Sequence, residues 1–155
     1  MVSAVPASKD NGSVNSLMSR FSSGSACRST TCSPMIATPH TQHVDQILHA
    51  LEAGCNVLCE KPLITSVADA HRIIEARDRT GKVGMVSCQR RFQPEFRYIR
   101  ERLKSGEVGK LQVVTGLSCQ EWKRATAGSW RQIPELSGGG QLNDTGSHFV
   151  DILLY

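Results

Sequence analysis

The pattern of apolar and polar residues changes period several times after residue 34. Short, β-rich apolar runs alternate with longer segments in which apolar residues recur at helical spacing. The expected strands are residues 35–37, 56–59 and 83–87, and the expected helices between them are residues 41–53 and 67–80. This alternation predicts an α/β fold with part of a Rossmann-type parallel sheet. Because parallel strands are usually covered on both sides, we expect helices on both faces.

The ends of the two helices carry their own signals. Gly54 and Gly81 follow the helices at positions where a left-handed residue commonly ends a helix. Ser66, with an aspartate three residues later, resembles a capping box at the start of the second helix. Within that helix we expect both Ile73 and Ile74 on the buried side.

A different pattern starts at Pro94, which can occupy the first turn of a helix. We expect this helix to end near Lys104 with its apolar stripe inward, at Phe96, Ile99 and Leu103. Further elements are expected as a strand at 111–117, a loop at 121–137 and a helix at 142–155. The chain therefore divides into a tail (1–33), the C-terminal part of a dinucleotide-binding domain (34–90) and the truncated beginning of a substrate or catalytic domain with an open α/β sheet (91–155).

Residues 1–33 differ from the rest because they hold ten serines and few large apolar side chains. Such a segment cannot bury enough surface to offset its ordering entropy. We interpret it as a disordered tail or as sequence foreign to the fold, such as a misread frame. A transit peptide is the alternative, because three basic residues face a single acid there.

Composition and charge exclude several classes of protein. With 39% hydrophobic and 21% charged residues, and no apolar run near the roughly 20 residues that span a bilayer, we expect a cytoplasmic protein without membrane contact. The net charge of +4 is small, and glutamates interleave with the basic residues of 90–104, so no nucleic-acid partner is expected. The six cysteines lack paired CxxC spacing, which favours small buried hydrophobes in a reducing compartment over metal ligands.

Two segments hold candidate chemistry. Lys61 follows Glu60 at the end of an expected strand, where ligands bind in open α/β sheets, and could stabilise a developing alkoxide. An ion pair with Glu60 is the structural alternative. Far downstream, Asp144, His148 and Asp151 share one face of the expected final helix, where a carboxylate could orient the imidazole as a proton acceptor. A capping aspartate beside a structural histidine fits that spacing equally well.

Taken together, the motifs resemble the Gfo/Idh/MocA family of NAD(P)-dependent sugar oxidoreductases over residues 36–155. The matching residues are Ala37-Thr38-Pro39 with His43, Ala53-Gly54, Glu60-Lys61-Pro62-Leu63, Arg90-Arg91-Phe92 with Pro94, Gly106 and Gly109, Trp130-Arg131, and Gly138-Gly139-Gly140 with Asp144-Thr145-Gly146-Ser147-His148 and Asp151.

The resemblance implies a role for each matching residue. It places Thr38, Pro39, His43, Glu60, Lys61 and Arg91 at the NAD or NADP site. By this resemblance, the catalytic residues are Lys61, Asp144 and His148. The residues expected to contact the substrate are Trp130, Arg131, Asp144 and His148. In the implied reaction a hydride passes to or from a carbon of a sugar, polyol or cyclitol, and the full-length protein is expected to form a homo-oligomer.

Two departures from the family affect this inference, and one is that most of the sheet of the second domain is absent. The family's glycine-rich GxGxxG turn, which cradles the pyrophosphate, does not occur in the chain, where Gly12 and Gly24 stand alone in serine-rich sequence. We therefore expect an internal part of such an enzyme that is weak or inactive by itself. The alternative is a non-catalytic remnant or interaction module of the same fold.

Overall fold

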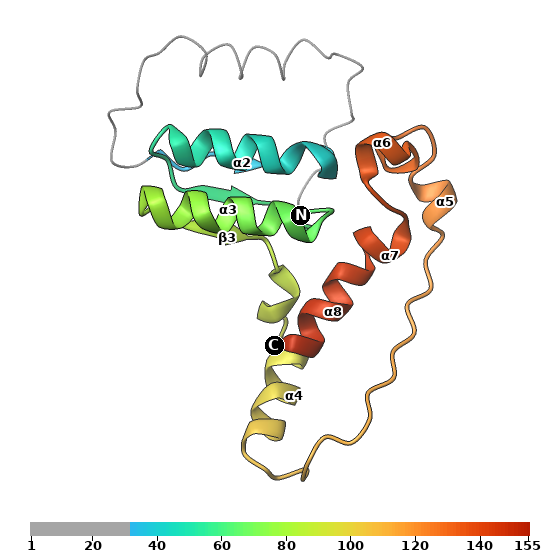
Figure 1. Cartoon of the computed structure of the whole chain (residues 1–155). Helices are drawn as coiled ribbons and strands as arrows, with labels where there is room; N and C mark the ends of the chain where they lie inside the picture. Colours follow the sequence, from blue (N-terminus) through green and yellow to red (C-terminus); the bar gives the residue numbers. More distant parts are fainter. Residues whose placement is uncertain (1–31) are drawn as a thin grey trace.

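A three-stranded parallel sheet organises the first part of the computed structural model, which describes residues 32–155 (Figure 1). Its strands, in the spatial order β1-β2-β3, are β1 (Met35–Ile36), β2 (Val57–Cys59) and β3 (Gly84–Val86). Leu58 lies in register with Met35 on one side and with Met85 on the other. The expected strand and helix alternation is confirmed.

The expected tail lies outside the described residues, apart from its last two positions. Cys32 already belongs to the fold, because its carbonyl accepts a hydrogen bond from the Asn56 amide at 3.0 Å. The described fold therefore includes at least two residues of the expected tail, whose predicted end lies just before Pro34.

Two helices cover one face of the sheet. They are α2 (His43–Glu52), preceded by the 3-10 turn η1 (His40–Gln42), and α3 (Val67–Thr80), and both lie on the same side in Figure 1. The core between the helices and the sheet holds Ile36, Val44, Ile47, Ala50, Leu51, Cys55, Val57, Cys59, Ile73 and Ala76. Met35 and Met85 are 71% and 54% exposed. Within residues 32–155 the second face is thus uncovered, which corrects the expectation of helices on both faces.

The helix ends follow the sequence signals. The Ser66 hydroxyl accepts a hydrogen bond from the Asp69 amide at the start of α3, and Gly81 ends the helix in the left-handed region at φ 65°. Gly54 is likewise left-handed, at φ 77°. One expectation is wrong: Ile73 is buried but Ile74 is 44% exposed, because the buried stripe of α3 continues through Ala76.

The second part of the chain is a series of helical segments. They are η2 (Gln89–Phe92), α4 (Pro94–Lys104), α5 (Trp122–Ala125), η3 (Trp130–Gln132), α6 (Pro134–Ser137), α7 (Gln141–Asp144) and α8 (Gly146–Leu154). Helix α4 has the predicted bounds, but Ile99 is 51% exposed because α4 extends away from the sheet (Figure 1). The segment expected as a loop contains three short helical turns, α5, η3 and α6.

Two further expectations for this part are wrong. Residues 111–117 are not a strand, since no other segment of the described chain pairs with them, and Leu117 is 91% exposed. The final helix is broken at Thr145. The carbonyl of Asp144 accepts from the Lys61 ammonium at 2.9 Å and from the Ser147 hydroxyl at 2.8 Å, whereas the amide of His148 bonds to Thr145. The side chains of Lys61 and Ser147 therefore bind the Asp144 carbonyl, which in a continuous helix would accept from the His148 amide.

Candidate functional site

Lys61 occupies the position that the sequence predicted, directly after the carboxyl end of β2. The Lys61–Pro62 peptide bond is cis. The side chain of Lys61 is 15% exposed and extends across to α7, 83 residues away in sequence. Its ammonium group donates to a carboxylate oxygen of Asp144 at 2.5 Å and to the backbone carbonyl of the same residue at 2.9 Å. Lys61 therefore joins the sheet to the second part of the chain.

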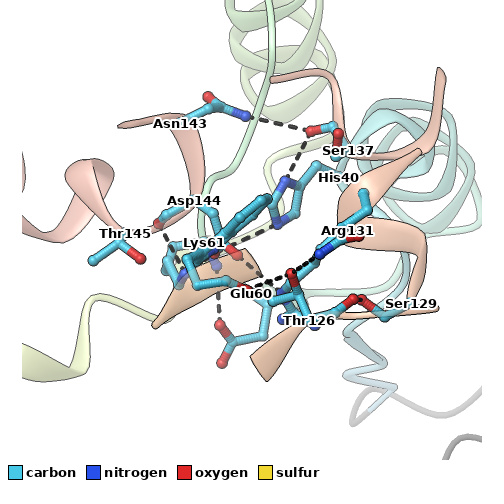
Figure 2. A network of polar contacts seen from close by, with 12 residues as sticks. His40, Glu60, Lys61, Thr126, Ser129, Arg131, Ser137, Asn143, Asp144 and Thr145 are labelled. Carbon is cyan, nitrogen blue, oxygen red and sulfur yellow. Dashed lines mark hydrogen bonds and ion pairs between the residues drawn. The ribbon is translucent and has the colours of Figure 1, made fainter. Parts of the chain in front are cut away.

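Asp144 is the centre of a small network of charges, which Figure 2 shows from close by. Its side chain is 8% exposed, with one carboxylate oxygen bound by Lys61 and the other by Arg131 Nε at 2.9 Å. Burial by itself would raise the pKa of this carboxyl, but the hydrogen bonds and positive charges of Lys61 and Arg131 outweigh burial and lower it. Asp144 is therefore ionised at neutral pH.

His148 lies in the first turn of α8 and is 9% exposed. The expected hydrogen bond from the His148 ring to the Asp144 carboxylate does not form within the described residues, because both oxygens of that carboxylate face Lys61 and Arg131. Burial lowers the pKa of His148, and the positive charges of Lys61 and Arg90 lower it further. The ring is thus held neutral and retains a nitrogen that can accept a proton.

Trp130 and Arg131 lie together on η3, and Arg131 contacts the site directly. The guanidinium carbon of Arg131 lies 4.4 Å from the centre of the Trp130 ring, while its Nε reaches Asp144. The side chain is 39% exposed, and only Nε is engaged with a carboxylate in the described structure. Its terminal nitrogens are therefore available to a ligand.

Three residues expected at the cofactor site follow β1 and β2 at the edge of the sheet where ligands bind. The Thr38 hydroxyl donates to Gln46 at 2.8 Å, so that side chain is turned toward α2. Pro39 precedes η1, and a carboxylate oxygen of Glu60 accepts from the Lys61 amide at 3.2 Å. The glycine-rich turn that holds the phosphates of a dinucleotide does not occur in the sequence.

Two further residues expected at the cofactor site make contacts within the chain. His43 is fully buried, with Nδ1 2.9 Å from the Pro62 carbonyl and Nε2 3.0 Å from the Thr38 carbonyl. His43 thus connects the loop after β1 to the loop after β2 at the edge of the sheet. The guanidinium of Arg91 is bound to both carboxylate oxygens of Asp151, at 2.5 to 3.1 Å. Arg91 thus anchors α8 to η2.

His40 lies at the site, although the sequence patterns did not assign it there. Its ring is 3% exposed, with Nδ1 2.9 Å from the Ser137 carbonyl and Nε2 3.9 Å from a carboxylate oxygen of Asp144. Its position directly after Thr38-Pro39, at the carboxyl end of β1, was the available signal. The spacing of single residues gave no indication that α6 would pack against this turn.

A cleft of about 910 Å³ lies beside Lys61. Its walls are mainly apolar and include Leu63, Ile64, Val86, Leu142 and Val150. None of the four expected substrate residues, Trp130, Arg131, Asp144 and His148, lines this cleft. The cleft therefore reaches Lys61 from the side of α7 and α8, apart from the expected substrate residues.

The cysteines and the acidic residues add no metal site in the described part of the chain. No group of three or more histidine, cysteine or acidic side chains there is placed to hold a metal ion. Burial raises the pKa of the Cys59 thiol to about 12, and Cys55 is equally buried, so both behave as small apolar residues. Cys119 is exposed, which corrects the expectation that all the cysteines are buried. Among residues 32–155, no helical segment combines the length and the hydrophobicity that a membrane span requires.

Comparison with known proteins agrees with this architecture. A family model described as an oxidoreductase family with an NAD-binding Rossmann fold matches residues 33–88, and a model of the GFO/IDH/MocA C-terminal domain matches residues 96–155. The chain belongs to the GFO/IDH/MocA family of oxidoreductases.

Its relatives include enzymes and solved complexes. D-glucoside 3-dehydrogenase of Escherichia coli is 32% identical over 77% of this chain and 34% of its own length. A crystal structure of the WlbA dehydrogenase from Thermus thermophilus with NAD and UDP-GlcNAcA is 27% identical, with a TM-score of 0.70, over 90% of this chain and 44% of that one. A levoglucosan dehydrogenase with NADH and levoglucosan gives 28% identity and a TM-score of 0.71, over 77% and 33%. The chain spans about a third of the length of the curated relatives it matches.

Proposed function

We propose that this chain carries the proton-handling part of an NAD(P)-dependent oxidoreductase that acts on a sugar, polyol or cyclitol. The observation that supports this most directly is the contact between Lys61 and Asp144, which brings together two motifs 83 residues apart at the ligand-binding edge of the sheet. The proposed substrate class is based on the relatives, which include a glucoside dehydrogenase and a levoglucosan dehydrogenase.

Each side chain of the site has a defined part in the proposed reaction. When bound, the nicotinamide supplies the acceptor or donor of the hydride. Two of the three N–H donors of the Lys61 ammonium bind Asp144, which leaves one to donate to the substrate oxygen that changes charge. His148, held neutral by burial and by nearby cations, takes the hydroxyl proton. Asp144 fixes the direction of the Lys61 amine, and Trp130 and Arg131 orient the substrate.

The 155-residue chain by itself should bind NAD(P) weakly and turn over no sugar. The GxGxxG turn that supplies backbone donors to the phosphates is not in its sequence. Titrating NADH and NADPH into the purified chain, followed by cofactor fluorescence, tests this statement. Saturable binding in the low micromolar range contradicts it.

The activity of the site is tested by a chimera. Residues 33–155 replace the matching segment of the E. coli D-glucoside 3-dehydrogenase, which supplies the remaining two thirds of an enzyme. Cofactor-dependent oxidation of a glucoside by the chimera, lost when Lys61→Met is introduced, supports the proposal. A folded chimera that binds cofactor but has no Lys61-dependent activity refutes it.

An interaction module of the same fold is the second candidate. Large apolar side chains are exposed on the second part of the chain, with Leu117, Leu154 and Val113 at 91%, 80% and 76%. Such surfaces favour contact with further protein, including a second copy in a homo-oligomer of the full-length protein. Assembly without cofactor binding in the chimera would favour this candidate over the enzyme.

A further inference from the structure

His40 connects the sheet to the segment that carries Asp144. It belongs to η1, directly after β1, and its Nδ1 lies 2.9 Å from the carbonyl of Ser137, 97 residues away. A carbonyl oxygen can only accept a hydrogen bond, so Nδ1 must carry the proton. In the neutral ring, Nε2 then holds a lone pair.

The partner carbonyl ends the short helix that leads to the site. Ser137 closes α6 and is 3% exposed. The same carbonyl lies 3.4 Å from the side-chain amide nitrogen of Asn143, the neighbour of Asp144 (Figure 2). Thr41, next to His40, donates its hydroxyl to the carbonyls of Glu135 and Leu136 at 2.9 and 3.1 Å. The turn η1 is therefore docked on α6 by several hydrogen bonds.

The other edge of the His40 ring faces the Lys61–Asp144 pair. Nε2 is 3.9 Å from the Asp144 oxygen that Lys61 binds at 2.5 Å. The Trp130 ring packs edge-on against the imidazole, with 4.7 Å between ring centres, and the ring of His43 lies 5.8 Å away on the side of α2. An Nε2 without a proton cannot compete with Lys61 for the Asp144 oxygen. A ring protonated on both nitrogens would compete.

We propose that His40 is a positioning residue, which holds α6 and α7 against the sheet and, with its lone pair on Nε2, leaves the Asp144 carboxylate to Lys61. This inference rests on the proposed function, in which the direction of the Lys61 amine matters. With 3% exposure, His40 does not touch the substrate, so it acts through Asp144 and Lys61.

The charged and titratable groups around the ring support this arrangement. Lys61 and Asp144 face it from the loop after β2 and from α7, His43 faces it from α2, and Arg131 holds the far oxygen of Asp144. Burial lowers the pKa of His40, and the nearby Lys61 and His43 lower it further, while the Ser137 bond and the Asp144 charge act in the opposite direction. The balance favours the neutral ring at neutral pH.

The first experiment reads the tautomer of His40 in the 155-residue chain by long-range ¹H–¹⁵N NMR at pH 7.5. We expect a neutral ring with the proton on Nδ1. A proton on Nε2, or on both nitrogens, would overturn the proposal. The measurement needs no substitution, so it stands even where a variant fails to fold.

The second experiment separates the two edges of the ring with amide side chains. The amide of His40→Asn can place its N–H near Nδ1 and keep the Ser137 bond, whereas that of His40→Gln reaches toward Nε2 and Asp144. We measure hydrogen exchange of the amides in 137–145 and acetylation of Lys61 by a soluble active ester. His40→Gln should speed both by about fivefold, and His40→Asn should change them less, because one buried hydrogen bond corresponds to roughly that factor.

The outcomes are separable from those of the enzyme proposal. Equal rates in His40→Gln, His40→Asn and the parent chain would show that His40 does not position the site. These readouts use neither cofactor nor substrate, so they hold whether or not the chimera oxidises a sugar. Failure of the chimera with a confirmed His40 effect would reject the activity while leaving the positioning role intact.

Discussion

At the scale of the residue, the site depends on a carboxylate that is buried and yet charged. Asp144 can remain ionised because Lys61 and Arg131 each satisfy one of its oxygens. A buried charge that loses a partner keeps its desolvation penalty without the compensating bond. The Lys61–Asp144 contact should therefore contribute to folding as well as to the proposed chemistry.

Lys61→Met tests this contribution. The substitution keeps an unbranched side chain of similar length but removes the ammonium group, so Asp144 retains only Arg131. We expect the free energy of unfolding to fall by about 1–3 kcal/mol, measured by urea unfolding at pH 7.5. Lys110→Met, at an exposed lysine, is the matched control and should change the value by less than about 0.5 kcal/mol. Equal losses in both variants would argue against a stabilising ion pair.

The histidines of the site make stability depend on pH. Burial is the main cause that lowers the pKa of both His40 and His148 in the folded chain, so the unfolded chain binds protons first. Their contribution is complete above the unfolded pKa of about 6.5 and is lost as the pH falls toward the lower folded values. The free energy of unfolding should therefore decrease between pH 7.5 and 5.5, as followed by urea unfolding.

Two variants test whether His148 contributes to this pH dependence of the free energy of unfolding. His148→Asn should flatten the decrease, because the buried ring no longer titrates, whereas His71→Asn, at an exposed histidine of α3, should leave it unchanged. A parent chain whose stability rises on acidification would contradict the inferred direction. Asp144 adds a separate loss at lower pH: burial would raise its pKa but Lys61 and Arg131 lower it, so its contribution is lost below about pH 4.

At the scale of the element, the ends of the helices are defined by local chemistry. Gly81 ends α3 in the left-handed region at φ 65°, and a β-carbon added there would meet no atom within 4 Å. Gly81→Ala therefore isolates the backbone cost, which we expect to lower the free energy of unfolding by about 1–2 kcal/mol in urea. Gly84→Ala in β3, where φ is not positive and contacts are ordinary, is the control and should be neutral or stabilising. A smaller loss for Gly81→Ala than for Gly84→Ala would contradict this account.

The elements that the sequence predicted well are those whose signals are local. Helix α3 has the expected bounds because Ser66 and Gly81 cap it, and α4 starts at Pro94 as expected. The break at Thr145 escaped prediction because it depends on Lys61, a side chain 83 residues away that binds the carbonyl of Asp144. The same holds for the site: motif residues were found individually, but the Asp144 carboxylate faces Lys61 and not His148.

At the scale of the whole molecule, the apolar core of residues 32–155 lies where α2 and α3 cover the sheet. Segment α6 is docked on η1, whereas α4 extends away from the core, and residues 111–120 run as a long connection between α4 and α5 (Figure 1). Gly116 passes so close to the Phe149 ring that a β-carbon there would lie 1.9 Å from it. Thr145 also donates its hydroxyl to the side chain of Gln120 at 2.9 Å. The connection thus contacts α7 and α8 through side chains and a close backbone approach.

Hydrogen exchange should distinguish residues 111–120 from the helix α2 that packs on the sheet. No backbone amide of residues 111–120 donates a hydrogen bond within the described chain, so these amides should exchange within seconds by mass spectrometry at pH 7. The amides of α2, whose helix packs on the sheet, should be protected for far longer. A β-rich segment with exposed valines and leucines can instead be covered by a second molecule, which would protect it. Protection of 111–120 that disappears on dilution would indicate such association. Protection that is independent of concentration would contradict the inference that the backbone amides of this segment are unpaired.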